Sequence, residues 1–297
     1  MRKLPKNLVA SVLARLRNQA QTEGVPFNRV LQFYAIERFL HRLSRSPHVD
    51  SVLLKGALLL KTIGIPRARP TMDIDLLRQG NADRTSLMTL VRDCALIEDE
   101  SDGVAFDPHS IAAEDIAKEA TYAGTRVRIG GRIGNVRLSV QIDFGVGDLV
   151  FPGPRLIEYP ALLDQPPVRL RAYPVEAAIA EKFQAMVELD TGNSRMKDFY
   201  DVWTYARHLA FDGTTLARSI AATFERRQTA LPTEPPTAFT ATYFGADARP
   251  RSGLAVWDFR PNRARLTCSR RGVTSYAAGT RSPMTSSCRA TRSSLSL

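Results

Sequence analysis

Several classes of protein are excluded by what this sequence lacks. It has only three cysteines in 297 residues, Cys94, Cys268 and Cys288, and no two of them are closely spaced. Such a set gives neither a disulfide framework nor a cysteine-based zinc site. The chain contains no run of 18 apolar residues, so we expect no membrane span. Its basic N-terminus has no uninterrupted apolar stretch and no small-residue cleavage site, which argues against a signal peptide and favours a cytoplasmic protein.

Lysine is absent from the end of the chain, although the protein as a whole is basic. Residues 245–297 hold ten arginines, no lysine and two acids, which is a net charge of +8. Taking this from the total of +11 leaves +3 for residues 1–244. The body of the chain is therefore only mildly basic, and the overall charge alone does not identify a nucleic-acid-binding domain.

The composition and the patterning predict a soluble α+β protein. Hydrophobic content of 44% and charged content of 24% are typical of globular chains, and the length allows about two domains. Apolar residues recur with helical spacing in several segments, and they alternate with polar residues in others. We predict helices over 4–22, 27–43, 84–100 and onward from 174, and strands over 71–77, 125–129 and 135–144.

The stretch from residue 53 to residue 77 contains the first candidate site. Lys55 and Gly56 precede an apolar run, a basic turn follows, and Asp73 and Asp75 then open a predicted strand. Side chains alternate along a strand, so these two carboxylates share a face and lie about 7 Å apart. Such an oxygen-rich pair suits Mg²⁺ that carries the phosphates of a nucleotide. The alternative is a pair of exposed acids at the end of a strand.

A third acid lies far from this pair in sequence. Asp143 stands near the end of the predicted strand 135–144, opposite the apolar face formed by Val136, Leu138, Val140 and Ile142. A metal site built from several strands needs such a residue. The alternative is that Asp143 only precedes a turn, and we interpret Asp148 as a turn residue.

Further charged residues lie on the predicted helices after Pro174. Lys182 is in the middle of the first of these helices, and Asp198 and Asp201 share one face of the next. A glycine at a helix start, here Gly56 after Lys55, also lets backbone N–H groups approach a phosphate. Basic side chains that could bind a triphosphate are those of Lys182, Arg195 and Lys197, although such residues also occur on ordinary solvated helix faces.

Six segments serve as motifs, and several of them are long enough to be specific: ERFLHRLSRS, LLKGALLL, RPTMDIDLL, QIDFGVGD, YPVEAAIAEKFQAMVELDTGNSRMKDFYDVW and LPTEPP. Together they resemble the AbiEii/AbiGii family of nucleotidyltransferase-like toxins, from about residue 8 to residue 237. The resemblance implies a DNA polymerase β-like nucleotidyltransferase core, with a small mixed β-sheet flanked by helices, and then a helical domain. We accordingly expect an N-terminal helical segment over 1–45, the core over 46–150, the helical domain over 151–240 and an atypical tail over 241–297.

The resemblance also implies an activity and its partners. Family members transfer a nucleotide from an NTP, with Mg²⁺, in type IV toxin–antitoxin and phage-defence systems, and some modify the acceptor ends of tRNA. An RNA acceptor and an AbiEi-like antitoxin encoded nearby are therefore expected. A small-molecule acceptor and an inactive nucleotide-binding remnant remain alternatives from other functional classes.

Individual roles follow from the same resemblance. Asp73 and Asp75 match the metal-binding pair of the D-x-D motif, and Asp143 resembles the third carboxylate of the superfamily. Other matches are Thr71 at the hydroxyl position before the first aspartate, Lys182 in the A-x-x-A-E-K motif, and Asp198 and Asp201 in the K-D-x-x-D motif. Lys55-Gly56-Ala57 stands where the superfamily usually has a Gly-Ser pair.

The tail has a different character from the rest of the chain. Residues 245–297 combine the ten arginines with 14 serines or threonines and show no sustained helix or strand period. We consider two hypotheses, a frame-shifted translation of GC-rich coding sequence and a disordered basic arm that binds RNA. Truncation at residue 244 separates them, because intact activity and RNA affinity would exclude the RNA-binding arm.

Overall fold

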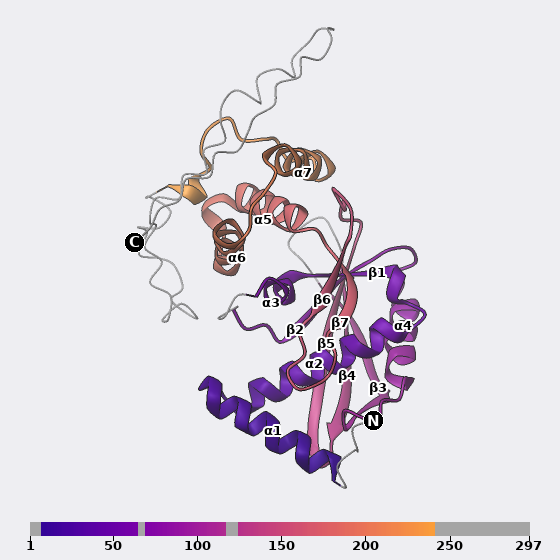
Figure 1. The fold of residues 1–297 in the computed structure, drawn as a ribbon. Helices are drawn as coiled ribbons and strands as arrows, with labels where there is room; N and C mark the ends of the chain where they lie inside the picture. The colour runs from indigo at the N-terminus through magenta and orange to yellow at the C-terminus, as the bar shows by residue number, and fades with distance from the viewer. Residues whose placement is uncertain (1–6, 65–68, 117–123, 241–297) are drawn as a thin grey trace. The chain divides into compact units, whose positions relative to one another are not determined.

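The computed structural model describes residues 7–64, 69–116 and 124–240 (Figure 1). These residues all belong to one compact unit, Met1–Arg249. Both hypotheses about the tail, and most of the basic turn before Asp73, lie outside the described residues. No described helix is both long enough and apolar enough to cross a membrane.

The fold is built on a seven-stranded mixed sheet with the strand order β3-β4-β5-β2-β1-β7-β6. Strands β2 and β5 run parallel, as do β1 and β7, and the other neighbouring pairs are antiparallel. This mixed sheet, flanked by helices, confirms the predicted fold class. The strands are β1 (Val52–Lys55), β2 (Asp73–Arg78), β3 (Val104–Ile116), β4 (Gly124–Ile133), β5 (Val136–Val146), β6 (Arg155–Tyr159) and β7 (Val168–Ala172).

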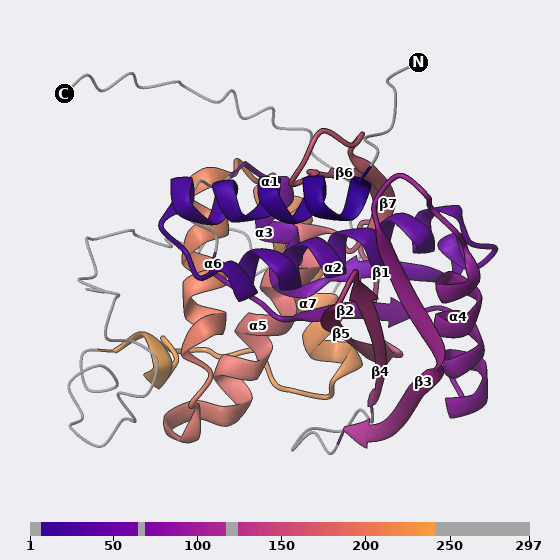
Figure 2. The same cartoon turned by 90° about the horizontal axis from the view of Figure 1, so that it is seen from below.

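Helices lie against the sheet and against one another. The helices α2 and α4 contact the sheet and α1 packs on α2, while α5 contacts both α6 and α7 (Figure 2). A 3₁₀ turn over Gly56–Leu58 leads from β1 into the short helix α3. The bounds are α1 (Leu8–Glu23), α2 (Phe27–Arg45), α3 (Leu59–Thr62), α4 (Arg84–Leu96), α5 (Val175–Leu189), α6 (Met196–His208) and α7 (Gly213–Arg226).

Alternating hydrophobicity determines which face of the sheet is buried. In β5 the side chains of Leu138, Val140 and Ile142 are buried, as the sequence pattern predicts, whereas Val136 at the start of the strand is half-buried. Ile74 in β2 is also fully buried, so its neighbours Asp73 and Asp75 point to the other face. The core therefore lies on one side of the central strands, and the candidate acids lie on the opposite side.

Side-chain caps begin three of the helices. Asn7, Asp83 and Asp212 accept hydrogen bonds from backbone N–H groups in the first turns of α1, α4 and α7, at 3.1, 2.8 and 2.7 Å. These bonds satisfy amide donors that have no partner inside a helix. The helix predicted from Pro174 begins at Val175, as expected for a proline that precedes a first turn.

The segment from residue 104 differs from the prediction. We predict a short strand and a helix-like segment over 104–118, but Val104–Ile116 forms the single long strand β3, and residues 117 and 118 lie outside the described residues. β3 pairs with β4 on both sides of an irregularity between Asp107 and Ala112, which surrounds Pro108. Pairing with a neighbouring strand thus overrides the local helix propensity of residues 111–116, IAAEDI.

The predicted helical domain begins with strands. Residues 155–172 contribute β6 and β7, and β7 pairs in parallel with β1. Among the described residues, helices follow only from Val175 onward within the range 151–240. The short strands were missed because their apolar residues are few and lie between proline-rich stretches.

Candidate active site

Three carboxylates stand on two neighbouring strands of the sheet. The parallel pairing of β2 with β5 places Asp75 opposite Asp143 and Asp73 opposite Gln141. Neighbouring strands lie about 4.8 Å apart, and directly paired residues point to the same face. The sheet topology thus brings Asp143 beside the Asp73–Asp75 pair, which the sequence alone left open.

Two of these acids already have polar partners on the same face. The guanidinium of Arg126, on β4, donates two hydrogen bonds of 2.8 Å to the two oxygens of Asp143. Gln141 Nε2 donates to Asp73 Oδ1 at 2.8 Å. These bonds fix the orientation of both carboxylates.

The pKa shifts of Asp73 and Arg126 reflect the negative charge of the neighbouring carboxylates. Burial raises the pKa of Asp73, and the charge of Asp143 raises it further, while Arg126 and Lys197 act in the opposite direction. Hydrogen bonds from Arg126 to Asp143 raise the pKa of the Arg126 guanidinium, and the charges of Asp143 and Asp73 add to this effect. A positive ion close to Asp73 and Asp143 would relieve their mutual repulsion.

The three carboxylates do not form a ready-made metal site. Across residues 7–64, 69–116 and 124–240, no three His, Cys, Asp or Glu side chains are grouped closely enough to hold a metal ion. Both oxygens of Asp143 accept hydrogen bonds from Arg126 instead. The predicted metal ligation by Asp73, Asp75 and Asp143 therefore stays a prediction, in which Asp143 has to release Arg126.

Gly56 lies directly against Asp75. Lys55, the residue before it, pairs with Asp75 across β1 and β2, and Gly56 has a φ of +72°. A Cβ atom added at Gly56 would lie 2.0 Å from Asp75 Oδ2. Only glycine allows both this backbone conformation and this close approach. The Lys-Gly pair thus begins a helical turn, as predicted, and its glycine adjoins a candidate metal ligand.

We predict that Gly56→Ala impairs activity far more than a matched glycine substitution. The new methyl group must displace the Asp75 carboxylate, and the left-handed backbone adds a cost of about 1 kcal/mol. Gly64→Ala is the control, because Gly64 has a φ of +69° and no atom of the described residues lies within 4 Å of an added Cβ. Nucleotidyl transfer and melting temperature should be measured for both variants. Equal losses of activity would show that the contact with Asp75 is unimportant.

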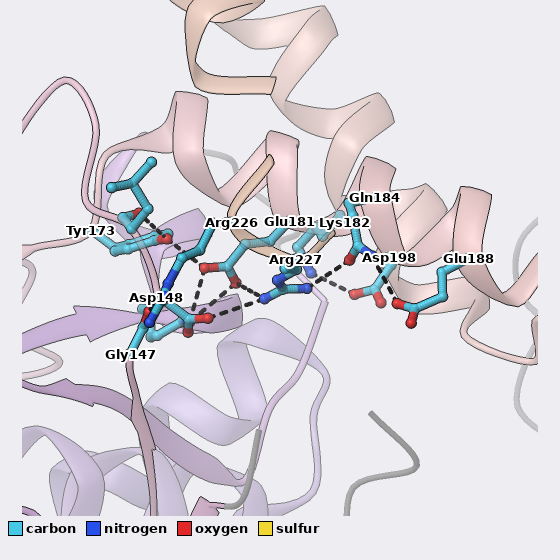
Figure 3. Close-up of polar contacts among 12 residues, drawn as sticks. Gly147, Asp148, Tyr173, Glu181, Lys182, Gln184, Glu188, Asp198, Arg226 and Arg227 are labelled. Carbon is cyan, nitrogen blue, oxygen red and sulfur yellow. Dashed lines mark hydrogen bonds and ion pairs between the residues drawn. The ribbon is translucent and has the colours of Figure 1, made fainter. Parts of the chain in front are cut away.

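Lys55 contacts acids from two distant parts of the chain, Asp148 and Glu181, both of which Figure 3 labels. Its Nζ lies 2.6 Å from Asp148 Oδ2, in the loop after β5, and 3.1 Å from Glu181 Oε2, on α5. Burial lowers the pKa of Lys55, but Glu181 and Asp148 outweigh this effect and the pKa is raised overall. The predicted contact of Lys55 with a phosphate is untested, and in this arrangement its charge is already balanced.

Arg227 completes this group of charges. Its Nη2 lies 3.1 Å from Asp148 Oδ1 and 3.6 Å from Glu181 Oε2 (Figure 3). The pKa of Asp148 is lowered overall, because Lys55 and Arg227 outweigh the opposing effect of burial. We call Lys55, Asp148, Glu181 and Arg227 the charge ring. It joins the ends of β1 and β5 to α5 and to the residue after α7.

The other predicted motif residues meet beside the charge ring. Lys182, the neighbour of Glu181 on α5, lies 2.5 Å from Asp198 and 2.9 Å from Asp201, both on α6. Arg69 binds Asp201 through two bonds, of 2.6 and 2.7 Å. Asp198 and Asp201 outweigh the effect of burial on Lys182 and raise its pKa. The A-x-x-A-E-K and K-D-x-x-D motifs therefore form one ion-pair cluster.

The remaining candidates lie around the acids. Lys197 is exposed at the start of α6, yet its charge lowers the pKa of Asp73. Arg195 is half-exposed and lies 4.0 Å from Asp198. Thr71 Oγ1 reaches only the backbone oxygen of Asp73, at 3.5 Å. The structure thus brings Lys197 electrostatically close to the acids, whereas Arg195 contacts the ion-pair cluster.

Several contributors were missed by reading the sequence. Asp148 was interpreted as a turn residue, and Glu181, Arg227, Arg126 and Arg69 were given no role. The sequence could have pointed to Glu181, because this acid directly precedes Lys182 in the A-x-x-A-E-K motif. The other residues are charges in loops or on a strand, and only the folded chain reveals their partners.

Most of the chain matches the model of one known protein family. The family model described as "Nucleotidyl transferase AbiEii toxin, Type IV TA system" matches residues 38–255. Among curated proteins, none matches the chain. Similar solved structures include JHP933 from Helicobacter pylori, at 14% identity and a TM-score of 0.43, which covers 67% of this chain and 79% of that chain.

Two further solved structures are similar at the same low level. A candidate nucleotidyltransferase from H. pylori is 14% identical, with a TM-score of 0.40 and coverage of 68% of this chain and 78% of that chain. An antigenic nucleotidyltransferase-like protein from Paracoccidioides brasiliensis is 13% identical, with a TM-score of 0.38 and coverage of 66% and 89%. The family match spans well over half of the sequence and includes every candidate site residue. The chain therefore belongs to the AbiEii family of nucleotidyl transferase toxins of type IV toxin–antitoxin systems.

Proposed function

We propose that this nucleotidyl transferase moves a nucleotide from an NTP to an RNA acceptor, with tRNA as the expected class, and that Mg²⁺ assists the transfer. The observation that supports this most directly is the pairing of β2 with β5, which sets Asp73, Asp75 and Asp143 on one face. The family to which the chain belongs supplies the reaction type. An AbiEi-like antitoxin is the proposed protein partner, and phage defence is the proposed setting.

The chemistry of the carboxylates fits a magnesium ion. Mg²⁺ prefers hard oxygen ligands and is usually held by one or two carboxylates together with phosphate oxygens. Burial raises the pKa of Asp73, and repulsion from Asp143 raises it further, an effect that a cation would offset. In the proposal Asp73 and Asp75 hold the metal, and Asp143 joins them when Arg126 moves away. The ion, when bound, activates the acceptor hydroxyl and stabilises the leaving pyrophosphate.

The basic side chains of α5 and α6 are proposed to face the triphosphate. Lys197 and Arg195 are exposed at the start of α6, and the charge of Lys197 already acts on Asp73. Lys182 forms ion pairs with Asp198 and Asp201, so we assign it mainly the role of positioning α6 relative to α5. During transfer the acceptor oxygen bonds to the α-phosphorus while the bond from that phosphorus to pyrophosphate breaks, and the protein mainly aligns these groups.

The test is a transfer assay with the full-length protein. Purified protein is incubated with each α-³²P-labelled NTP, Mg²⁺ and total bacterial RNA, beside an Asp73→Ala/Asp75→Ala control. Label in an RNA band with the wild type alone would identify both the NTP and the RNA class. Folded wild-type protein that labels no RNA would contradict the RNA acceptor, and a parallel assay with small hydroxylated acceptors would then distinguish a different acceptor from an inactive enzyme.

A further inference from the structure

A row of arginines extends from the candidate acids along the exposed face of β4 and β5. Register pairs place Arg126 opposite Asp143, Arg128 opposite Gln141 and Arg132 opposite Arg137. The residues between them, such as Val127 and Val140, are buried on the other face. Arg128, Arg132 and Arg137 therefore share the face that bears Asp73 and Asp143. We call these three residues the arginine row.

The far end of the arginine row forms no ion pair within the part of the chain that the structure describes. Arg126 pairs with Asp143, and Arg128 pairs with Glu114 at 2.8 Å. Arg132 and Arg137 are both exposed, and neither forms an ion pair with any residue that the structure describes. Like charges placed directly opposite each other on a sheet are unfavourable. Two such arginines create a local positive potential that an anionic ligand would neutralise.

The position of the row suits a long polyanion better than a small one. Arg137 lies six positions from Asp143 on β5, which is about 20 Å along a strand. β2, β5 and β4 are adjacent in the sheet (Figure 2), so Asp73 and Arg137 lie on one face of three neighbouring strands. A ligand that contacts both ends of this face must extend over several phosphates. Arginine is well suited to such contacts, because its planar guanidinium donates paired hydrogen bonds to phosphate oxygens.

We propose that the arginine row binds the phosphate backbone of the RNA that receives the nucleotide. The proposal rests on the proposed function, because it assigns a path to the acceptor of the same site. The end of the RNA would lie at Asp73, Asp75 and Asp143, and the strand that leads to it would cross Arg128 and then Arg132 and Arg137. Because the contacts are to phosphates, they fix position and affinity but do not select a sequence.

The test compares Arg132→Ala/Arg137→Ala with the wild type in two assays. The first measures binding of a fluorescently labelled single-stranded RNA and of bulk bacterial tRNA by anisotropy, between about 50 and about 200 mM salt. We expect roughly tenfold weaker binding of both RNAs, and a salt slope for the single strand that is smaller by about 1.4, or about 0.7 for each lost contact. The second assay measures label transfer to RNA at subsaturating RNA, where the loss should follow the affinity.

Controls separate a local effect from a general loss of charge or of folding. Arg92→Ala/Arg169→Ala removes the same charge from exposed sites on α4 and β7, and it should leave RNA binding unchanged. The melting temperature of Arg132→Ala/Arg137→Ala should be equal to or above that of the wild type, because a like-charge contact is removed. If the wild type binds and labels RNA and Arg132→Ala/Arg137→Ala does so equally well, the role of the arginine row is overturned while the proposed function stands. Wild-type protein that neither binds nor labels RNA would overturn the proposed function as well.

Discussion

We expect an Asp73→Asn protein to fold as the wild type does but to transfer nucleotide at least about 100-fold more slowly. Losses of this size are typical when one preorganised electrostatic group is removed from an active site. Asparagine keeps the shape of the side chain, and its oxygen can still accept the hydrogen bond from Gln141. The lost property is therefore the negative charge that the proposal assigns to Mg²⁺.

The stability of the same variant makes this prediction sharper. Burial and the nearby Asp143 both disfavour the charged form of Asp73, as its raised pKa shows. Replacing this carboxylate by a neutral amide should therefore leave the melting temperature unchanged or raise it slightly. A loss of activity then cannot be attributed to unfolding. Residues that are unfavourable for folding but are retained at a site are typical of functional positions.

Magnesium provides a second readout that does not depend on turnover. A ligand that binds only the folded state stabilises it by about 1.4 kcal/mol at ten times its dissociation constant. Mg²⁺ together with a non-hydrolysable NTP should raise the melting temperature of the wild type and raise that of Asp73→Asn much less. Asp115→Asn, at an exposed acid on β3, serves as the control. Near wild-type transfer by Asp73→Asn would refute the role given to Asp73.

The sequence predicted those parts of the fold whose pattern is local. Alternation along 135–144 gave β5 and its buried face, and the apolar spacing after Pro174 gave α5. Alternation also put Asp73 and Asp75 on one face, as found. The prediction for residues 104–116 was partly wrong, because their local composition favours a helix while the partner strand β4 imposes a strand.

What the sequence could not predict depends on contacts between distant residues. The proximity of Asp143 to Asp75 follows from a parallel register between strands 68 positions apart, and no local pattern encodes that register. The bonds of Arg126 to Asp143 likewise require the pairing of β4 with β5. Asp148 has the sequence context of a turn, and its function in the charge ring appears only when β1 and α5 are placed beside it. Motif resemblance identified Lys182, Asp198 and Asp201, but not that they bind one another.

The charge ring leads to the second large effect, which is on stability. We expect Lys55→Met to lower the free energy of unfolding by about 3–5 kcal/mol, because breaking a buried ion pair leaves uncompensated charge. Lys55 is only 16% exposed, and without it Arg227 is the one basic side chain among the described residues that pairs with Asp148 and Glu181. The melting temperature should fall by roughly 10 °C in a chain of this size.

Two further variants show whether the lost charge balance causes the fall in stability of Lys55→Met. Lys55→Met/Glu181→Gln removes one charge of each sign, so it should recover much of the lost stability. Lys61→Met is the matched lysine control, since burial lowers the pKa of Lys61 to about 8 and its charged form is disfavoured where it lies. This control should change the melting temperature little. A fall as large as that of Lys55→Met would indicate lost packing of the lysine stem.

The same variants test whether the charge ring positions the active site. Glu181 and Lys182 are consecutive on α5, so the ring holds the helix that also anchors Asp198 and Asp201. If Lys55 acts by position, transfer measured well below the melting temperature should fall in Lys55→Met and recover in Lys55→Met/Glu181→Gln. If Lys55 instead contacts the triphosphate, the double variant should stay inactive and show a raised KM for NTP although it is stable. Measurement of kcat and KM for the two proteins therefore decides between the phosphate contact predicted from the sequence and the positioning role indicated by the charge ring.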